Sequence, residues 1–446
     1  METEKKWEDM TWQERREVRF KKWHDAPGVE FKDAAAKQAY QERVTRYVKA
    51  IKLEEPDRVP VNLPAGYLPA SWAGYSLGQV MYDYDKLADA WYRFNHEMQP
   101  DSATGPGLVY PGRVLEIIGH KLHKWPEHGL PEDAPMYQYI EGVYMQADEY
   151  DAFNMNPTDY WLRTFLPRTA SGFEGFQYLS PFSPVLTNPL GWILSASRPE
   201  VQASLQNLLD AGTEIRKWAA AVGRVSKALL EEGWPTFGGG MAGAPFDNVS
   251  DVLRGTEGIV QDMFRQPEKI HEMMERLVPI IVSGAVRGVN RSLSPIVPMP
   301  LHKGENSFMS QKHFETFYWP TFKKVLLGLI DEGIVPMPFA EGNYEPRLEV
   351  IADMPKSAII WYFEVMDMVR AKKILGGHTC IAGNVPASVL VTGSYDQVKE
   401  SCRRLIETCA PGGGYILTGG AGMNKGDANN LKAMMEAARE YGTYAK

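Results

Sequence analysis

Cysteine is scarce in this chain. Only Cys380, Cys402 and Cys409 occur among 446 residues, and no two of them form a Cys-x-x-Cys pair. The pattern therefore indicates neither a disulfide framework nor a zinc site made of cysteines alone. Long hydrophobic runs are also missing, since no apolar stretch reaches the ~20 residues that a membrane helix needs. The first residues, Met1 to Lys6, lack the apolar stretch of a signal peptide, so we expect a cytoplasmic protein without membrane contact.

Basic residues are too few and too scattered to suggest a nucleic-acid partner. The chain has 48 Lys and Arg against 56 Asp and Glu, which gives a formal net charge of -8 at pH 7. No basic run is available to neutralise phosphates, and we therefore expect no binding of nucleic acid. Aromatic residues are plentiful at 11%, which suits a large core and an aromatic-lined pocket.

Short apolar runs that end in turn residues alternate with helical periodicity along most of the chain. This alternation is typical of parallel strands joined by crossover helices. At 446 residues the chain could hold more than one domain, but barrels often run this long as single units. The candidate strands match the roughly eight of a (β/α)8 barrel, so the sequence predicts an α/β fold of that type. They are Val59–Leu63, Pro100–Thr104, Pro235–Gly240, Ile296–Leu301, Val335–Ala340, Ala358–Phe363, Thr379–Gly383 and Tyr415–Thr418.

Two regions fall outside this alternation. Residues 7–52 are charged and helical in pattern, and the Glu-Glu-Pro-Asp-Arg run at 54–58 ends that pattern before the first strand. We therefore predict an N-terminal helical extension over 1–52 and the barrel over 53–446. Residues 105–205 are rich in Tyr, Trp, Phe and Pro, which indicates an insertion at the barrel mouth. The insertion either only covers the barrel or takes part in substrate binding, and the sequence leaves both open.

A glycine-rich turn at Gly238–Gly243 satisfies the G-x-G-x-x-G pattern of dinucleotide-binding proteins and follows a short strand. Residues 244–248 separate this turn from the next helix, which begins near Val249. That separation prevents the helix N-terminus from capturing a pyrophosphate. We therefore do not expect a dinucleotide site.

The run His378-Thr379-Cys380 has the His-x-Cys spacing of zinc ligands. In our strand assignment His378 precedes its strand and Cys380 lies inside it. Active sites of such barrels lie at the opposite, carboxyl-terminal ends of the strands. We therefore interpret His378 as a surface histidine and Cys380 as a core cysteine.

Polar side chains stand at the ends of three neighbouring predicted strands. His302 follows 296–301, Glu341 follows 335–340 and Glu364 follows 358–363. One imidazole and two carboxylates can hold a catalytic zinc ion with an open position, and such a ligand set suits a Lewis acid at an ether or hydroxyl oxygen. Glu305 and His313 are close in sequence and could replace His302. The alternative is that these are ordinary polar residues in loops or salt bridges.

The C-terminal third contains Gly383-Asn384-Val385-Pro386 and, after a helical segment, Ala-Pro-Gly-Gly-Gly-Tyr-Ile-Leu at 410–417. These stretches resemble the uroporphyrinogen decarboxylase superfamily, whose members include tetrapyrrole decarboxylases and corrinoid-dependent methyltransferases. The resemblance spans most of residues 45–446 and implies a barrel, with Asn384 at the end of a strand. A Gly-Ala-Pro-Phe turn similar to residues 243–246 follows a barrel strand in that superfamily.

The resemblance distinguishes three branches. Thiol-activating zinc methyltransferases place His-x-Cys-Gly-Asn at a strand end, where this chain has Phe-Ala-Glu-Gly-Asn at 339–343. A further cysteine of those enzymes falls at Ala421, so the thiol type of zinc site is absent. Residues 63–69 resemble the decarboxylase motif Arg-Gln-Ala-Gly-Arg-Tyr-Leu-Pro without its arginines, which a polycarboxylate substrate needs as bidentate partners. The last strand loop also lacks the histidine expected of a decarboxylase.

The resemblance therefore favours the corrinoid-dependent O-demethylase branch. It implies a methyltransferase that moves a methyl group from the oxygen of a methoxylated aromatic compound to Co(I) of a separate corrinoid protein. Zinc is the candidate metal, on His302, Glu341 and Glu364, which are also the candidate catalytic residues. The expected substrate contacts, at other strand ends, are Tyr67, Asp101 and Asn384. Homodimerisation is left open, as are two alternatives: a decarboxylase or other lyase of a smaller carboxylate, and a non-catalytic binding barrel.

Overall fold

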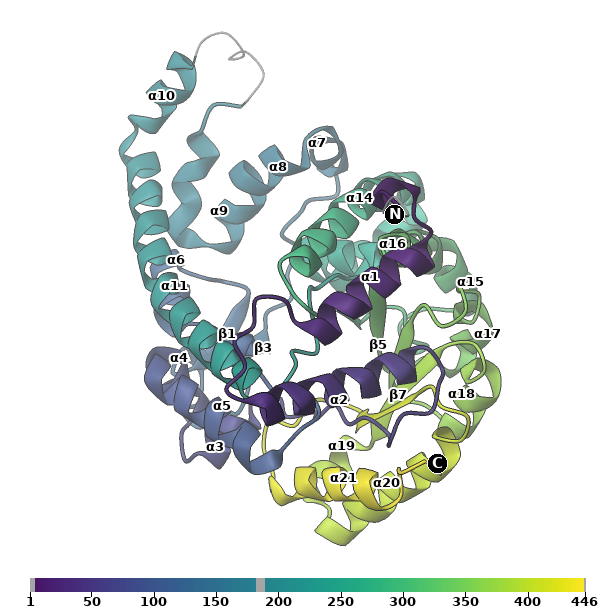
Figure 1. Cartoon of the computed structure of the whole chain (residues 1–446). Coiled ribbons are helices and arrows are strands. Elements are labelled where there is room, and N and C mark those ends of the chain that lie inside the picture. Colours follow the sequence, from purple (N-terminus) through teal and green to yellow (C-terminus); the bar gives the residue numbers. More distant parts are fainter. Residues whose placement is uncertain (1–4, 182–188, 445–446) are drawn as a thin grey trace.

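The centre of the fold is a parallel sheet from the C-terminal half of the chain (Figure 1). The computed structural model describes residues 5–181 and 189–444. Five strands of this sheet lie side by side in chain order, and helices connect them, so the chain is an α/β protein. The strands predicted from residue 296 onward are confirmed. They are β4 (Ile296–Leu301), β5 (Val335–Asn343), β6 (Ile360–Val365), β7 (Cys380–Val385) and β8 (Tyr415–Gly419).

The helices of this half begin at residues that suit a helix N-terminus. The hydroxyl of Ser394 accepts the amide of Gln397, whose side chain in turn accepts the amide of Ser394, and this capping box starts α20. Asp367 caps α18 in a similar way. The elements after β4 are α15 (Gln311–His313), η6 (Phe314–Tyr318), α16 (Trp319–Asp331), η7 (Glu345–Arg347), α17 (Leu348–Ile351), α18 (Met368–Leu375), α19 (Ala387–Thr392), α20 (Tyr395–Cys409) and α21 (Asn429–Glu440).

Prolines explain where regular strand pairing stops. The carbonyls of Ile296 and Pro298 accept the amides of Gly239 and Ala242, so this side of β4 faces segment 235–242. In a strand, the amide and the carbonyl of one residue face the same neighbouring strand. Pro298 and Pro300 have no backbone N–H, so they cannot donate a hydrogen bond back to segment 235–242. The segment therefore bonds to β4 without being a regular strand.

Three extended segments continue the sheet beyond its five strands. Segment 59–63 lies beside β8, since Asn62 donates to Leu417 and Leu417 donates to Pro60. Segment 101–104 lies beside segment 235–242 through a parallel bridge between Ala103 and Thr236. The amide of Val61 is taken by the carboxylate of Asp101 at 2.8 Å rather than by a backbone carbonyl. The three segments coincide with the first three predicted strands.

The N-terminal helices cover the amino-terminal ends of the strands. α1 (Trp12–Asp25) starts with a capping box of Thr11 and Glu14, and α2 (Ala34–Ile51) is capped by Asp33. Buried residues of α2, such as Tyr47, form one apolar cluster with the first residues of the strands, such as Ile296 and Cys380. Because α2 packs there, the carboxyl-terminal ends of the strands are left for other contacts.

Residues between the first segments and β4 form a mostly helical region. Its small sheet has the order β2-β1-β3, and the long helix α11 carries α10 at its far end, away from the main sheet (Figure 1). No helix in residues 5–181 or 189–444 is both long and apolar enough to span a bilayer. The elements outside the C-terminal half are η1 (Trp7–Asp9), α3 (Leu68–Trp72), α4 (Leu77–Tyr82), α5 (Tyr84–Met98), η2 (Pro106–Leu108), α6 (Gly112–Ile118), β1 (His123–Pro126), β2 (Gly129–Leu130), β3 (Gln138–Tyr139), α7 (Tyr150–Met155), α8 (Pro157–Tyr160), η3 (Trp161–Phe165), α9 (Leu166–Thr169), η4 (Ser171–Tyr178), α10 (Leu190–Ala196), α11 (Pro199–Glu231), α12 (Pro245–Asp247), η5 (Asn248–Arg254), α13 (Gly255–Arg265) and α14 (Pro267–Asn290).

Candidate active site

The carboxyl-terminal ends of β4, β5 and β6 bring together the three side chains that the sequence singles out. His302 follows β4 directly, and its Nε2 lies 3.7 Å from Oε2 of Glu341 in β5. Glu364 of β6 accepts the amide of Gly342 at 2.7 Å, and its charge acts on Glu341. His302 and Glu341 therefore form a pair, with Glu364 beside them.

Two further carboxylates complete the group, and both come from the turn of α12 and η5. Asp251 Oδ2 lies 2.5 Å from Nδ1 of His302. Asp247 is buried and accepts the backbone amides of His302 and Lys303 at 3.1 and 2.9 Å. Because one carboxylate binds the imidazole and the other binds its backbone, the ring of His302 is fixed with Nε2 toward Glu341.

The surroundings change the protonation of these groups. The hydrogen bond to Asp251 is the main cause that raises the pKa of His302 to about 9, so the imidazole is a cation at neutral pH. Burial raises the pKa of Glu341 to about 6. Burial, with the nearby charge of Asp251, raises the pKa of Asp247 to about 6. The site therefore combines an imidazolium with carboxyl groups that titrate close to neutral pH, as acid-base sites do.

Buried residues behind the site hold its loops. The hydroxyl of Tyr318, at the end of η6, donates to Asp247 at 2.7 Å. Arg347 is fully buried and donates to the carbonyls of Gly304 and Met309, while its guanidinium lies 4.8 Å from the ring centre of Phe314. These contacts fix the loop that follows His302, so the imidazole is held from both its backbone and its ring.

A pocket of about 650 Å³ opens beside this group. Its lining includes Asp247, Asp251, His302 and Lys303. The lining is otherwise mostly apolar, with Met241, Ala242, Val252, Ile280, Ile281 and Ala285. Tyr139 and Glu141, from the predicted insertion, also line the pocket, as do Gly243, Asn248, Gly284 and Pro300. The pocket thus places an apolar compartment of ligand size against an acid-base group.

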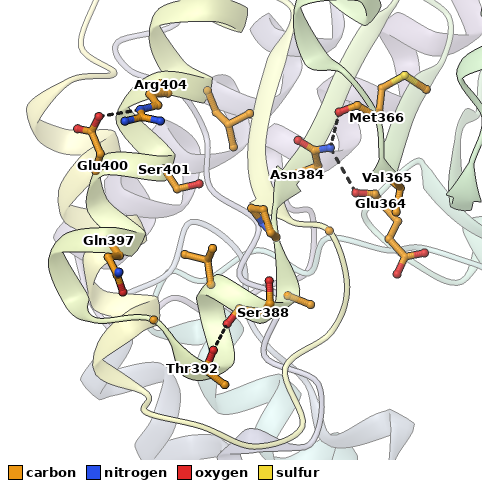
Figure 2. A pocket seen from close by; sticks show the side chains of 16 residues that line it. Glu364, Val365, Met366, Asn384, Ser388, Thr392, Gln397, Glu400, Ser401 and Arg404 are labelled. Carbon is orange, nitrogen blue, oxygen red and sulfur yellow. Dashed lines mark hydrogen bonds and ion pairs between the residues drawn. The ribbon is translucent and has the colours of Figure 1, made fainter.

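A larger pocket, of about 1030 Å³, lies at the ends of β6 and β7 (Figure 2). It is lined by Glu364 and Asn384 and by polar residues of α19 and α20, including Arg404. Figure 2 shows the amide of Asn384 directed at the backbone of β6, where it donates to the carbonyls of Glu364 and Met366 at 3.3 and 3.0 Å. Asn384 therefore holds the end of β6 and leaves its side-chain oxygen available to a ligand.

Two of the predicted substrate contacts lie elsewhere. Tyr67 is half-buried against Tyr137, with ring centres 5.2 Å apart, and burial raises its pKa to about 12. Asp101 is 1% exposed, and its carboxylate binds Arg46 at 2.7 Å and Arg58 at 2.5 Å. The sequence predicts that Asp101 contacts substrate from a strand end, but the structure places this residue at the beginning of its extended segment. There its carboxylate is engaged in ion pairs near the N-terminal helix α2.

The remaining motifs from the sequence lie away from the pair of His302 and Glu341. His378 precedes β7 and contacts the carbonyl of Met354, and Cys380 is buried as the first residue of β7. Glu305 is bound by Ser307, and His313 of α15 packs against Phe317, so neither replaces His302 beside Glu341. The glycine-rich turn leads into α12, which continues directly into η5 and α13. The helical stretch therefore begins at Pro245, and the prediction that it begins near Val249 is wrong.

The zinc prediction can be tested against the donor positions. Two ligands of one tetrahedral zinc ion, each about 2.0–2.2 Å from the metal, stand roughly 3.4 Å apart. His302 and Glu341 come close to that separation, but Glu364 is turned to the amide of Gly342. Within 5–181 and 189–444, no three His, Cys, Asp or Glu side chains are grouped so as to hold a metal ion. The predicted three-ligand set is therefore not assembled in this structure.

A family model for uroporphyrinogen decarboxylase (URO-D) matches residues 184–441, more than half of the 446-residue chain. The chain belongs to the uroporphyrinogen decarboxylase family. The family match covers β4 to β8 and therefore includes His302, Glu341, Glu364 and Asn384. Tyr67, Asp101 and Tyr139 lie outside it. The predicted membership is confirmed, and the region of the match holds most of the candidate site.

A solved structure of a methyltransferase from Methanosarcina mazei is similar to this family member over most of both chains. The two chains are 16% identical, the TM-score is 0.54, and the match covers 89% of this chain and 98% of the other. At this identity the likeness shows a shared fold alone. No curated protein matches the chain.

Sequence reasoning missed Asp247 and Asp251, although one signal for them was present. The Gly-Ala-Pro-Phe turn resembles a turn of the URO-D family, and Asp247 is the next residue. Asp251 follows four positions later, which puts both carboxylates on one face of a helical turn. Their link to His302 depends on the packing of η5 against the end of β4, which no local pattern encodes.

Proposed function

We propose that this protein is a methyltransferase that moves a methyl group from the oxygen of a methoxylated aromatic compound to Co(I) of a corrinoid carried by a separate protein. The family and the shared fold support methyl transfer without identifying its substrate. The observation that carries the proposal is His302, held as a cation by Asp251, with Nε2 directed to Glu341 beside a mostly apolar pocket.

The reaction needs help at oxygen, because an ether releases an alkoxide poorly. Reduced corrinoid supplies the nucleophile for the methyl carbon. As the carbon-oxygen bond breaks, its electron pair stays on oxygen, and His302 donates the Nε2 proton to that oxygen. Asp251 stabilises the imidazolium before transfer, and Glu341 orients the proton at Nε2. The apolar wall excludes water and holds the aromatic ring so that the methyl carbon faces the acceptor.

The architecture proposed with this function is a (β/α)8 barrel over 53–446, preceded by a helical extension over 1–52. It is supported by the three extended segments that continue the sheet from β4 and from β8. The insertion at 105–205 would form the rim that receives the corrinoid protein, since it already supplies Tyr139 and Glu141 to the pocket. Tyr67 and Asn384 remain predicted substrate contacts, and a homodimer remains open.

Zinc also remains a prediction. His302 Nε2 and Glu341 are the donors placed to hold an ion, but a proton from His302 serves the same leaving oxygen without one. Metal analysis of the purified protein separates the two cases, since about one equivalent of zinc would assign the electrophile to a metal. Methyl transfer that survives chelation would assign it to the proton.

The decarboxylase alternative requires a cationic anchor for a carboxylate substrate. The described residues that line the pocket include no arginine, and both of its cations already have carboxylate partners. A binding barrel without catalysis is disfavoured by the raised pKa of Glu341, which faces Nε2 of His302, and by the raised pKa of Asp247, which lines the pocket.

The decisive assay mixes the purified protein with cob(I)alamin and a panel of methoxylated aromatics, and follows methylcobalamin by absorbance. Glu341→Ala should abolish turnover while leaving the fold intact, because the proton at Nε2 loses its partner. Glu345→Ala is the matched control, since Glu345 pairs with Arg370 on the surface. Near-normal activity of Glu341→Ala would remove Glu341 from the mechanism. Absence of transfer with any donor and a matched corrinoid protein, alongside CO2 release from a carboxylate, would establish the decarboxylase.

A further inference from the structure

The pocket beside His302 carries more acid than base. Glu141, Asp247 and Asp251 line it together with His302 and Lys303. Glu341 adds a further carboxyl group at the other nitrogen of His302. At neutral and higher pH the carboxylates outnumber the cations, so the field in the pocket is negative.

Neither cation is free to receive an anion. Asp251 Oδ2 occupies Nδ1 of His302, and Glu341 faces Nε2. The Nζ of Lys303 donates to the hydroxyl of Thr256 at 2.7 Å and lies 3.6 Å from Asp251 Oδ1. An incoming carboxylate would have to displace one of these partners and remain close to the others, which costs desolvation without a net gain in ion pairs.

Apart from Asn248 and Tyr139, which donate to the backbone carbonyls of Ala244 and Asp251, the rest of the lining has little polar character. Met241, Val252, Ile280 and Ile281 are large apolar side chains that line the pocket. Such a wall gains from burial of an aromatic or aliphatic surface and gains nothing from a charged group. The volume of about 650 Å³ accommodates a small ring compound with substituents.

From this arrangement we infer that the pocket selects an uncharged methyl ether and excludes substrates that carry a carboxylate, sulfonate or phosphate. The inference rests on the proposed function for its reaction, but the charge selection itself concerns binding alone. Glu141 is the specificity residue that can be changed without touching the acid-base pair, because its carboxylate binds the amide of Thr256.

The test measures binding of two ligands of equal shape, 4-methoxybenzamide and 4-methoxybenzoate, to the purified protein by calorimetry at pH 8 without corrinoid. The amide should bind on the order of tenfold more tightly than the benzoate, as expected for one unfavourable charge in a partly buried site.

Glu141→Gln tests the role of this carboxylate, because glutamine keeps an oxygen for the amide of Thr256 and removes the charge. This variant should reduce the preference for the benzamide over the benzoate severalfold, whereas Glu345→Gln on the surface should leave that preference unchanged. Equal or tighter binding of the benzoate in the unaltered protein would overturn the inference, as would failure of both ligands to bind. A preference for the amide without any methyl transfer would preserve the charge selection and remove the proposed function.

Discussion

Two buried aspartates, Asp101 and Asp247, have contrasting surroundings in this protein. Asp101, close to the helical extension, accepts two arginines and the amide of Val61. Asp247, at the opposite ends of the strands, is bound by backbone amides and by the hydroxyl of Tyr318, with another carboxylate nearby. The first carboxylate has arginines as partners, whereas the second has no arginine bonded to it among the described residues.

The difference teaches how to distinguish a structural acid from a chemical one. Arginine partners balance the charge of a carboxylate and fix neighbouring elements to each other. Backbone and hydroxyl donors, with a like charge beside them, leave the carboxyl group able to gain a proton near neutral pH. Burial alone does not separate the two groups, but the nature of their hydrogen-bond donors does.

The largest expected effect is on catalysis at the site around Asp247 and His302. His302→Gln removes the proton donor and should lower kcat/KM by roughly 10²–10⁴-fold, the usual contribution of a general acid. His313→Gln, in the nearby helix α15, is the matched control and should change the rate little. Equal rates for the two variants in the methylcobalamin assay would contradict a role of His302 as general acid.

Asp101→Asn should have the largest effect on stability. It leaves the buried Arg46 and the half-buried Arg58 without their shared carboxylate, which should cost about 3–5 kcal/mol in the free energy of unfolding. Urea denaturation at pH 7 measures this change, and Asp331→Asn is a control because that carboxylate is exposed at its ion pair with Arg15. A loss below about 1 kcal/mol would show that Asp57 and solvent compensate the arginines.

A smaller effect is expected on the pH dependence of Asp251→Asn. Asp251 raises the pKa of His302 to about 9, so activity that needs the imidazolium should fall through that pH in the unaltered protein. Without Asp251, the fall should move toward the ordinary histidine value of about 6.5. The stability that Asp251 gives through His302 should be full below about 6.5 and be lost as the pH rises through 9. If the alkaline fall of kcat/KM in Asp251→Asn stays near pH 9, the result would contradict this role of Asp251.

The smallest effects belong to the beginning of β7. His378→Ala and Cys380→Ala should leave turnover and metal content unchanged, since both residues lie at the amino-terminal end of the strand. Metal analysis and the methylcobalamin assay on each variant check this. Loss of bound metal in either variant would show that the metal lies at the amino-terminal ends of the strands and not beside His302.

The parallel strands were predictable because each is a short apolar run followed by a helix. The run at 296–301 has the same bounds in sequence and structure. The irregular segment 235–242 was less accessible to such reasoning, because its failure to form a strand depends on Pro298 and Pro300 of a neighbour. Pairing partners in a sheet are distant in sequence, so a propensity cannot report them.

Only part of the candidate site could be predicted from the sequence, for the same reason. His302 and Glu341 were found because each ends a strand, and strand ends of parallel sheets meet at one edge. Asp101 also had the right residue type, but its arginines come from α2 and from residue 58, which no motif connects with it. Glu364 bonds to a backbone amide, a partner that leaves no trace in the sequence.

The wall of the pocket joins stretches of chain that are far apart. The hydroxyl of Tyr139, in β3, donates to the carbonyl of Asp251 at 2.7 Å across 112 positions of sequence, and Glu141 binds Thr256 beside it. The strand ends supply His302 and Glu341, while a separate segment supplies part of the pocket lining beside them. A descendant gene could therefore exchange the segment around β3 and acquire a new substrate range, while inheriting its reaction chemistry unchanged.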